Sequence, residues 1–216
     1  MNTLLSETKQ LFSGLDAAWA VCGGFALDLF LGRETRPHGD IDLCAFEEGR
    51  GTIQAYMHGL GWRVYEFRGM GRVRLLTPDT PGEAGRNLMC VRDGCELVDF
   101  YPSDVEGLLW HVFHHVGIHK LNYLEFLFNG SENGSFVFDR EKGISRPMSE
   151  AILFREDVPF LCPELALLYK AGHAEEAKNQ SDFREVFPAL DDGQMAWLRE
   201  SVAALHGKGH PWLDEL

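Results

Sequence analysis

The sequence predicts an α+β protein in which a mixed sheet is backed by helices and followed by a helical C-terminal part. Between residues 19 and 138, short apolar or alternating runs are separated by glycine-rich and polar turns, which is typical of strands. After Pro147 the apolar residues recur at helical spacing instead. A chain of 216 residues is long enough for one large domain with a helical appendage. We therefore expect a catalytic domain over residues 1–155 and a helical domain over residues 156–216 that closes a cleft.

The first elements alternate between helix and strand. An apolar stripe predicts a helix over residues 4–15, and a short apolar run predicts a buried strand over 19–22. The run ends at a Gly-Gly turn, after which residues 25–31 regain a helical pattern. Alternating polar and apolar residues over 40–46 predict the next strand.

Later segments are read in the same way. Antiparallel strands are expected at residues 62–67, 72–76, 87–92 and 95–101, with hairpin turns at residues 68–71 and 93–94. An amphipathic pattern predicts a helix over 105–119, and residues 122–128 and 135–138 read as one more hairpin. The C-terminal helices are expected to start at Pro163 and to cover 182–190 and 194–205.

The charge of the chain limits the class of partner. There are 33 acidic and 20 basic side chains, which gives a formal charge of −13. Nucleic-acid binding depends on neutralising phosphates, so this balance disfavours a nucleic-acid partner. A cationic small molecule, or an anion chelated to a metal, is the expected partner.

The N-terminus does not resemble a secretory leader. It has no basic stretch followed by a long apolar run and a small-residue cleavage site, and no span reaches 18 uninterrupted apolar residues. We expect no membrane interaction and a cytoplasmic location.

Residues 21–43, VCGGFALDLFLGRETRPHGDIDL, carry the most informative pattern. Gly23-Gly24 lies between an expected strand and helix, where bare backbone lets an anion approach the helical N–H groups, as in a phosphate cradle. Asp40 and Asp42 are two residues apart on a strand, so both carboxylates project from one face. Such a pair suits a hard divalent ion with oxygen ligands, typically Mg²⁺ bound to a nucleoside triphosphate.

A two-metal phosphoryl-transfer site usually has a third carboxylate. We predict Asp99 for this role, because its apolar neighbours place it on a mostly buried strand where an unpaired carboxylate is costly. Glu96 is the competing residue, but three positions away it faces the other side of a regular strand.

These residues together resemble the nucleotidyltransferase superfamily that includes DNA polymerase β. Residues 23–43 are similar over their whole length to the motif of the aminoglycoside 2''-adenylyltransferase and lincosamide nucleotidyltransferase group, and the segment GCELVDFYP resembles its third-carboxylate strand. The resemblance implies the nucleotidyltransferase fold, Mg²⁺ held by Asp40, Asp42 and Asp99, and Asp99 as general base. The tail from Pro163, with residues 178–183 and 210–213, resembles the helical half of the same group.

Three cations are candidates for binding the nucleotide phosphates. Arg36 could neutralise phosphate or hold the loop before Asp40, and the rigid guanidinium suits either task. Lys170 and Lys178 are the candidates in the helical part, with an ordinary surface role as the alternative. Four histidines over 111–119 occur at helical spacing but lack a His-Glu-x-x-His pattern, so a packed helix face is the preferred interpretation.

The function expected from the sequence is Mg²⁺-dependent transfer of a nucleotidyl group, AMP from ATP or another nucleoside triphosphate, to a hydroxyl of a small molecule. An aminoglycoside or lincosamide antibiotic is the acceptor that the resemblance implies. Two alternatives stay open: a catalytically silent binding or regulatory protein with this fold, and a toxin-type enzyme that modifies protein or RNA.

Overall fold

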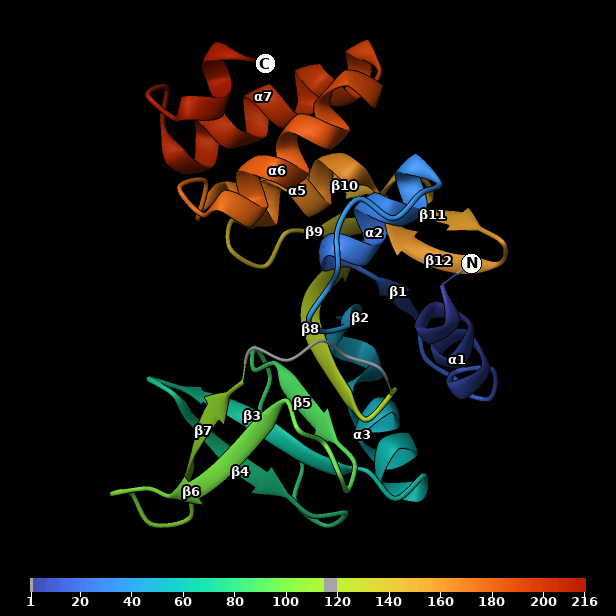
Figure 1. The fold of residues 1–216 in the computed structure, drawn as a ribbon, viewed down its shortest axis with the longest axis vertical. Helices are drawn as coiled ribbons and strands as arrows, with labels where there is room; N and C mark the ends of the chain where they lie inside the picture. The colour runs from blue at the N-terminus through green and yellow to red at the C-terminus, as the bar shows by residue number, and fades with distance from the viewer. Residues whose placement is uncertain (1, 115–119) are drawn as a thin grey trace. The chain divides into compact units, whose positions relative to one another are not determined.

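The computed structural model describes residues 2–114 and 120–216 (Figure 1). The chain divides into two compact units: the first comprises residues 1–20 and 38–131, and the second comprises residues 21–37 and 132–216. This division differs from the predicted boundary at residue 155. The segment after the Gly-Gly turn and two strand pairs before residue 162 belong with the C-terminal helices, because they pair and pack with one another in the second unit.

The first unit contains a mixed sheet in the order β2-β8-β5-β3-β4-β7-β6. Strands β2 and β8 are parallel, and every other neighbouring pair in this order is antiparallel. The predicted α+β class with a mixed sheet is confirmed. The helices of this unit and the strands of this order are α1 (Thr3–Leu11), β2 (Asp42–Phe46), α3 (Arg50–Gly59), β3 (Arg63–Gly69), β4 (Arg72–Leu76), β5 (Leu88–Val91), β6 (Val98–Pro102), β7 (Leu109–Phe113) and β8 (Tyr123–Glu132).

Strands β6 and β7 curl back over one face of this sheet. The ring of Phe100 on β6 stacks on buried Tyr65 of β3 at 4.1 Å, and the ring of Phe113 on β7 meets Tyr123 of β8 edge-on at 5.8 Å. A flat sheet would hold these strands apart, since neighbouring strands are spaced by about 4.8 Å. The curl encloses a small aromatic and aliphatic core on this face.

Helices α1 and α3 lie against the opposite face. Phe12, which follows α1, packs edge-on against Phe126 of β8 at 5.7 Å, and the Arg50 guanidinium of α3 lies 3.7 Å from the ring centre of Phe128. Because side chains alternate along a strand, Phe126 and Phe128 face these helices while Tyr123 and Glu125 face the other way.

The second unit consists of short strands and five helices among its described residues. Val21 of β1 (Trp19–Val21) pairs in parallel with Phe160, and the stacked rings of Phe183 and Trp212 lie 4.4 Å apart in its helical part. Its helices and remaining strands are α2 (Gly23–Leu31), β9 (Ser135–Val137), β10 (Ser145–Pro147), α4 (Met148–Ala151), β11 (Ile152–Arg155), β12 (Val158–Leu161), α5 (Pro163–Ala171), α6 (Ala177–Val186) and α7 (Asp192–His206). In the described part of the chain, no helix has both the length and the apolar character needed to cross a bilayer.

Two local predictions are wrong. The segment expected to be helical over 105–119 contains strand β7 instead, which pairs with both β4 and β6. The rest of that predicted helix, residues 115–119, lies outside the described residues. The Asp93-Gly94 turn does not join a hairpin, because β5 pairs with β3 and β8 while β6 pairs with β7.

Candidate active site

The two aspartates of the motif lie at the start of β2. Asp42 is its first residue and is partly buried, Asp40 is exposed, and Ile41 between them is fully buried. The alternation predicted from the sequence is therefore present: the apolar side chain anchors the segment in the core and leaves the two carboxylates outside it.

A third carboxylate lies beside this pair, and it is Glu125 on β8. Asp42 and Glu125 are direct partners in the parallel ladder, and the Glu125 backbone N–H donates a 3.2 Å hydrogen bond to the Ile41 carbonyl. The Tyr123 hydroxyl donates a 2.6 Å hydrogen bond to Glu125 Oε1. Strand pairing thus places Glu125, which accepts a hydrogen bond from the Tyr123 hydroxyl, next to Asp42.

The Glu125 carboxyl is an unusual acid. Burial raises its pKa to about 7, the Tyr123 hydrogen bond opposes that rise, and the negative charge of Asp40 adds to it. A carboxyl with a pKa near neutrality is suited to accept a proton during catalysis.

Strand pairing does not place Asp99 next to Asp40 and Asp42, in contrast to the expectation from the sequence. It lies on β6, at the far end of the strand order from β2, with a side chain that is 57% exposed. Its carboxylate contacts His114 Nε2 at 2.9 Å. The apolar neighbours that suggested a buried strand are explained by the curl of the sheet, since Val98 and Phe100 face the enclosed core while Asp99 faces outward.

Sequence reasoning missed Glu125 although a signal was available. It is the single charged residue in the run Tyr-Leu-Glu-Phe-Leu-Phe over residues 123–128. The argument applied to Asp99, that a carboxylate in an apolar strand needs a partner, applies equally to Glu125. Choosing between the two required the strand order.

The glycine pair begins helix α2 in the second unit. Gly23 has a φ of +63°, a left-handed conformation that other residues rarely adopt, so the turn from β1 into α2 requires glycine there. This agrees with the predicted strand–turn–helix arrangement. The phosphate-binding role of Gly23 and Gly24 stays a prediction.

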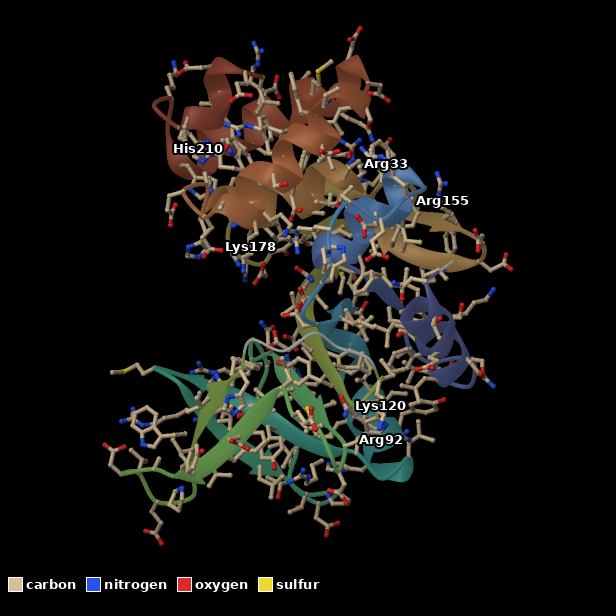
Figure 2. The ribbon with its side chains drawn as sticks, in the orientation of Figure 1. Arg33, Arg92, Lys120, Arg155, Lys178 and His210 are labelled. Carbon is tan, nitrogen blue, oxygen red and sulfur yellow. The ribbon has the colours of Figure 1, made fainter. Side chains whose placement is uncertain are left out.

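Arg36 and Lys170 meet at one buried carboxylate of the second unit. The Arg36 guanidinium donates through Nε and Nη2 to the two oxygens of Asp182, at 2.8 and 2.9 Å, and Lys170 Nζ lies 2.8 Å from Oδ2. Burial alone would raise the pKa of Asp182, but the Arg36 hydrogen bonds and the Lys170 charge lower it below its ordinary value. Lys178 does not join this group; it lies on α6 with a 62% exposed side chain and pairs with Glu176 (Figure 2).

Histidines do not build a metal centre in the described part of the chain. There, no three His, Cys, Asp or Glu side chains form a group able to hold a metal ion by themselves. His111 packs edge-on between Phe67 and Phe113, in line with the preferred interpretation as packing, although on a strand. His115 and His119 lie outside the described residues.

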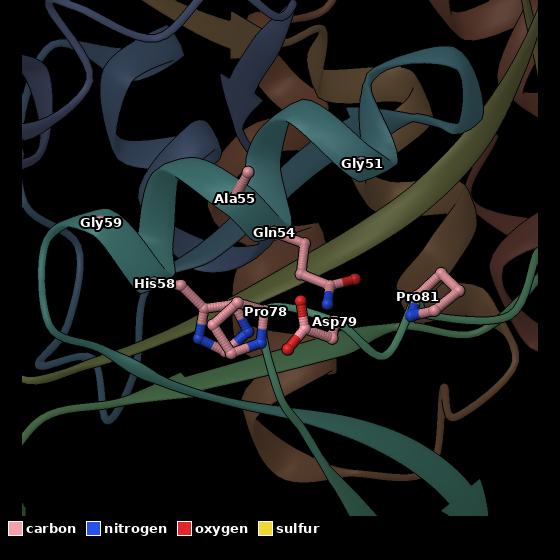
Figure 3. Close-up of a pocket in the computed structure, with 8 residues that line it drawn as sticks. All are labelled: Gly51, Gln54, Ala55, His58, Gly59, Pro78, Asp79 and Pro81. Atoms are coloured by element: carbon pink, nitrogen blue, oxygen red, sulfur yellow. The ribbon is translucent and has the colours of Figure 1, made fainter.

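A pocket of about 440 Å³ opens elsewhere in the first unit, between α3 and the loop after β4 (Figure 3). Its polar side chains are those of Gln54, His58 and Asp79. Gln54 holds the loop in place, since its amide donates to the carbonyls of Thr77 and Thr80 at 3.2 and 2.7 Å. The pocket contains none of the predicted site residues.

Comparisons with known proteins agree with the motif. Residues 4–80 match the aminoglycoside-2''-adenylyltransferase family. A 2''-aminoglycoside nucleotidyltransferase of Escherichia coli and one of Klebsiella pneumoniae are each 52% identical over 44 residues, which is 20% of this chain and 25% of the relative. The chain therefore aligns with about a quarter of the length of these curated relatives.

Solved structures show the same fold over nearly the whole chain. ANT(2'')-Ia in complex with adenylyl-2''-tobramycin matches with a TM-score of 0.54 and 17% identity, covering 94% of this chain and 98% of that one. The lincomycin-bound lincosamide adenylyltransferase LnuA matches with a TM-score of 0.50 and 14% identity, covering 86% and 96%. The nucleotidyltransferase fold and the resemblance to this group are confirmed.

Proposed function

We propose that this chain transfers a nucleotidyl group, AMP from ATP, to a hydroxyl of a small molecule that also carries amino groups. The observation that carries the proposal is the pairing of Asp42 with Glu125, which sets the carboxylates of the family motif beside a third carboxyl with a raised pKa. The family match over residues 4–80 supports the same chemistry.

The donor set fits magnesium bound to a nucleotide. Asp40, Asp42 and Glu125 offer only carboxylate oxygens, the ligand type that Mg²⁺ prefers, and the effect of Asp40 on the pKa of Glu125 shows that their charges repel. Mg²⁺ usually binds through one or two carboxylates with water and substrate phosphates, so a complete protein cage is not required. We assign Asp40 and Asp42 to the ion. When bound, Mg²⁺ neutralises charge on the phosphates and orients them.

Glu125 takes the proton-accepting role that the sequence suggested for Asp99. Tyr123 occupies Oε1 as a hydrogen-bond donor and fixes the carboxyl, which leaves Oε2 to accept a proton from the acceptor hydroxyl. The hydroxyl oxygen then bonds to the α-phosphorus, and the bond to the leaving pyrophosphate breaks. The proton of the acceptor hydroxyl stays on Glu125, whose pKa near 7 suits that transfer.

A glycine turn and a group of cations are the candidates for binding the triphosphate. We assign Gly23 and Gly24 at the start of α2 to phosphate oxygens, and Arg36 and Lys170 to the remaining charge. Lys178 is kept as a more exposed candidate for the same role. The carboxylates and the glycine turn belong to one continuous stretch of sequence, residues 23–42, so both roles are contained in the segment that matches the family.

The acceptor is expected to be cationic. The formal charge of −13 favours positively charged ligands, and the relatives are named for aminoglycosides and, in the case of LnuA, for a lincosamide. Aminoglycosides carry several amino groups and hydroxyls, so they are the first class to test, with lincosamides second.

The test is a screen of nucleoside triphosphates with Mg²⁺ against aminoglycosides and lincosamides. Products carrying an added nucleotidyl group are detected by mass spectrometry, and released pyrophosphate is measured in parallel. The Asp42→Asn and Glu125→Gln variants are the matched controls and should give no product. Nucleotide binding without product or pyrophosphate across the panel would contradict the proposal and favour the silent binding protein.

A further inference from the structure

We propose that Asp182 is a positioning residue that presents Arg36 and Lys170 to the phosphates of the nucleotide; this rests on the function proposed above. The inference begins from the way the two cations are held. Asp182 is the partner of both, and it comes from a third element, helix α6, whereas Arg36 follows α2 and Lys170 lies near the end of α5.

The exposure of the three side chains is graded. The Asp182 side chain is 2% exposed, Lys170 is 13% exposed and Arg36 is 24% exposed. The carboxylate is thus the least exposed group, and the two cations are more accessible to solvent. An anion approaching from solvent would meet the guanidinium and the ammonium before the carboxylate.

The hydrogen bonds to Asp182 also fix the orientation of the two cationic groups. Arg36 binds Asp182 through Nε and Nη2, a two-point contact that sets the plane of the guanidinium, and its Nη1 donates to the Pro37 carbonyl at 3.2 Å. Lys170 uses one ammonium hydrogen on Asp182 and has two more to donate. A free Arg or Lys side chain loses rotamer freedom when it binds a ligand, and prior fixation removes much of that cost.

The segment that carries Arg36 is held at several points. Asp28 of α2 accepts hydrogen bonds from the Thr35 N–H and hydroxyl at 3.0 and 2.7 Å, and Arg33 pairs with Glu185 of α6. Of the two ion pairs that join this segment to α6, the one between Arg36 and Asp182 is buried, whereas Arg33 and Glu185 are 56% and 43% exposed, and a pair so exposed contributes little to holding the segment. The exposed pair therefore serves as a matched control for the buried one.

A positioning role and simple electrostatics predict opposite changes in polyphosphate affinity when Asp182 is replaced by Asn. Asp182→Asn removes a negative charge beside two cations, so charge alone predicts tighter binding of a polyphosphate. If Asp182 positions the cations, binding weakens in spite of the added positive charge. We expect the dissociation constants of Mg-ATP and of Mg-pyrophosphate to rise at least tenfold in Asp182→Asn, and Asp182→Glu to recover part of the affinity.

The experiment measures binding of Mg-ATP and Mg-pyrophosphate to the full chain by calorimetry at low temperature, where the fraction folded is checked by circular dichroism. Glu185→Gln, which removes a carboxylate from the same helix one turn later, should stay within twofold of the wild type. In an Arg36→Gln, Lys170→Met background, adding Asp182→Asn should cause no further loss. This background keeps the test valid if the single variant is poorly folded.

Two results would overturn the inference. If wild type binds Mg-ATP and Asp182→Asn binds it equally or more tightly while folded, Asp182 has only a structural role and the proposed function stands. If the wild type binds neither Mg-ATP nor Mg-pyrophosphate, the proposed function fails and the inference fails with it.

Discussion

We predict that Glu125 makes the stability of this protein depend on pH in the direction opposite to that of a typical paired carboxylate. Burial and the nearby charge of Asp40 raise its pKa from 4.5 to about 7. Replacing Glu125 with Gln removes the titration while keeping an oxygen that can accept the hydrogen bond from the Tyr123 hydroxyl. The difference in unfolding free energy between this variant and the wild type therefore isolates the titration of one group.

The direction of this pH dependence follows from the pKa values of Glu125 in the unfolded and the folded chain. As the pH rises past 4.5 the unfolded chain loses the proton, while folded Glu125 keeps it until about pH 7. The contribution of Glu125 to stability is thus complete below pH 4.5 and is lost as the pH rises through about 7. A pKa difference of this size corresponds to about 3 kcal/mol, a substantial part of the stability of a typical domain.

The assay is urea unfolding of wild type and Glu125→Gln in chelator, from pH 4.5 to pH 8.5. We expect Glu125→Gln to gain between about 1 and 3 kcal/mol relative to wild type across this range, since relaxation and water entry reduce the ideal value. Magnesium with a nucleotide should reduce the gap at pH 8 by stabilising the ionised wild-type site. A difference that is constant with pH would refute the raised pKa and the base role built on it.

Three further predictions follow from the same geometry. Asp42→Asn should lower nucleotidyl transfer by at least about 100-fold, because it removes an anion from the pair proposed to hold Mg²⁺, while circular dichroism and melting temperature stay near the wild-type values. Substantial activity in this variant would remove Asp42 from the proposed site. Asp99→Asn should keep transfer within about twofold of wild type, because this side chain is 57% exposed on the edge strand β6; a loss matching that of Glu125→Gln would restore Asp99 as the third carboxylate. For a polycationic acceptor, KM should rise several-fold from about 0.05 to about 0.5 M salt, because screening weakens its attraction to a chain of charge −13; a KM that does not respond to salt, measured against a neutral acceptor as control, would contradict the electrostatic argument.

The parts of the site that depend on local sequence could be predicted. The turn at Gly23, the helix after it and the alternation over residues 40–46 need only backbone preferences and a period of two or 3.6 residues. The same is true of the C-terminal helices, where Pro163 marks a helix start and Asp191 forms a capping box with Gln194.

The third carboxylate could not be predicted in this way because its identity depends on strand order. Asp99 and Glu125 are each an acidic residue with apolar neighbours on both sides in the sequence. Only the parallel pairing of β2 with β8 distinguishes them, and that pairing joins residues about 80 positions apart. Strand β7 was missed for a related reason. Its short, largely apolar sequence fits both the helical period of 3.6 residues and the strand period of two, and pairing with β4 and β6 makes it a strand.

The pairing of β2 with β8 also sets the order in which the site comes into existence during synthesis. The aspartates leave the ribosome about 80 residues before Glu125, and closing a parallel pair over so long a loop is an intrinsically slow step. A nascent or truncated chain that stops before β8 would still contain the whole segment that matches the family, residues 4–80, but would lack the residue proposed as proton acceptor, Glu125. The proposed chemistry would therefore be acquired only after the parallel pair of β2 and β8 has formed, and transfer activity would report on that long-range folding event.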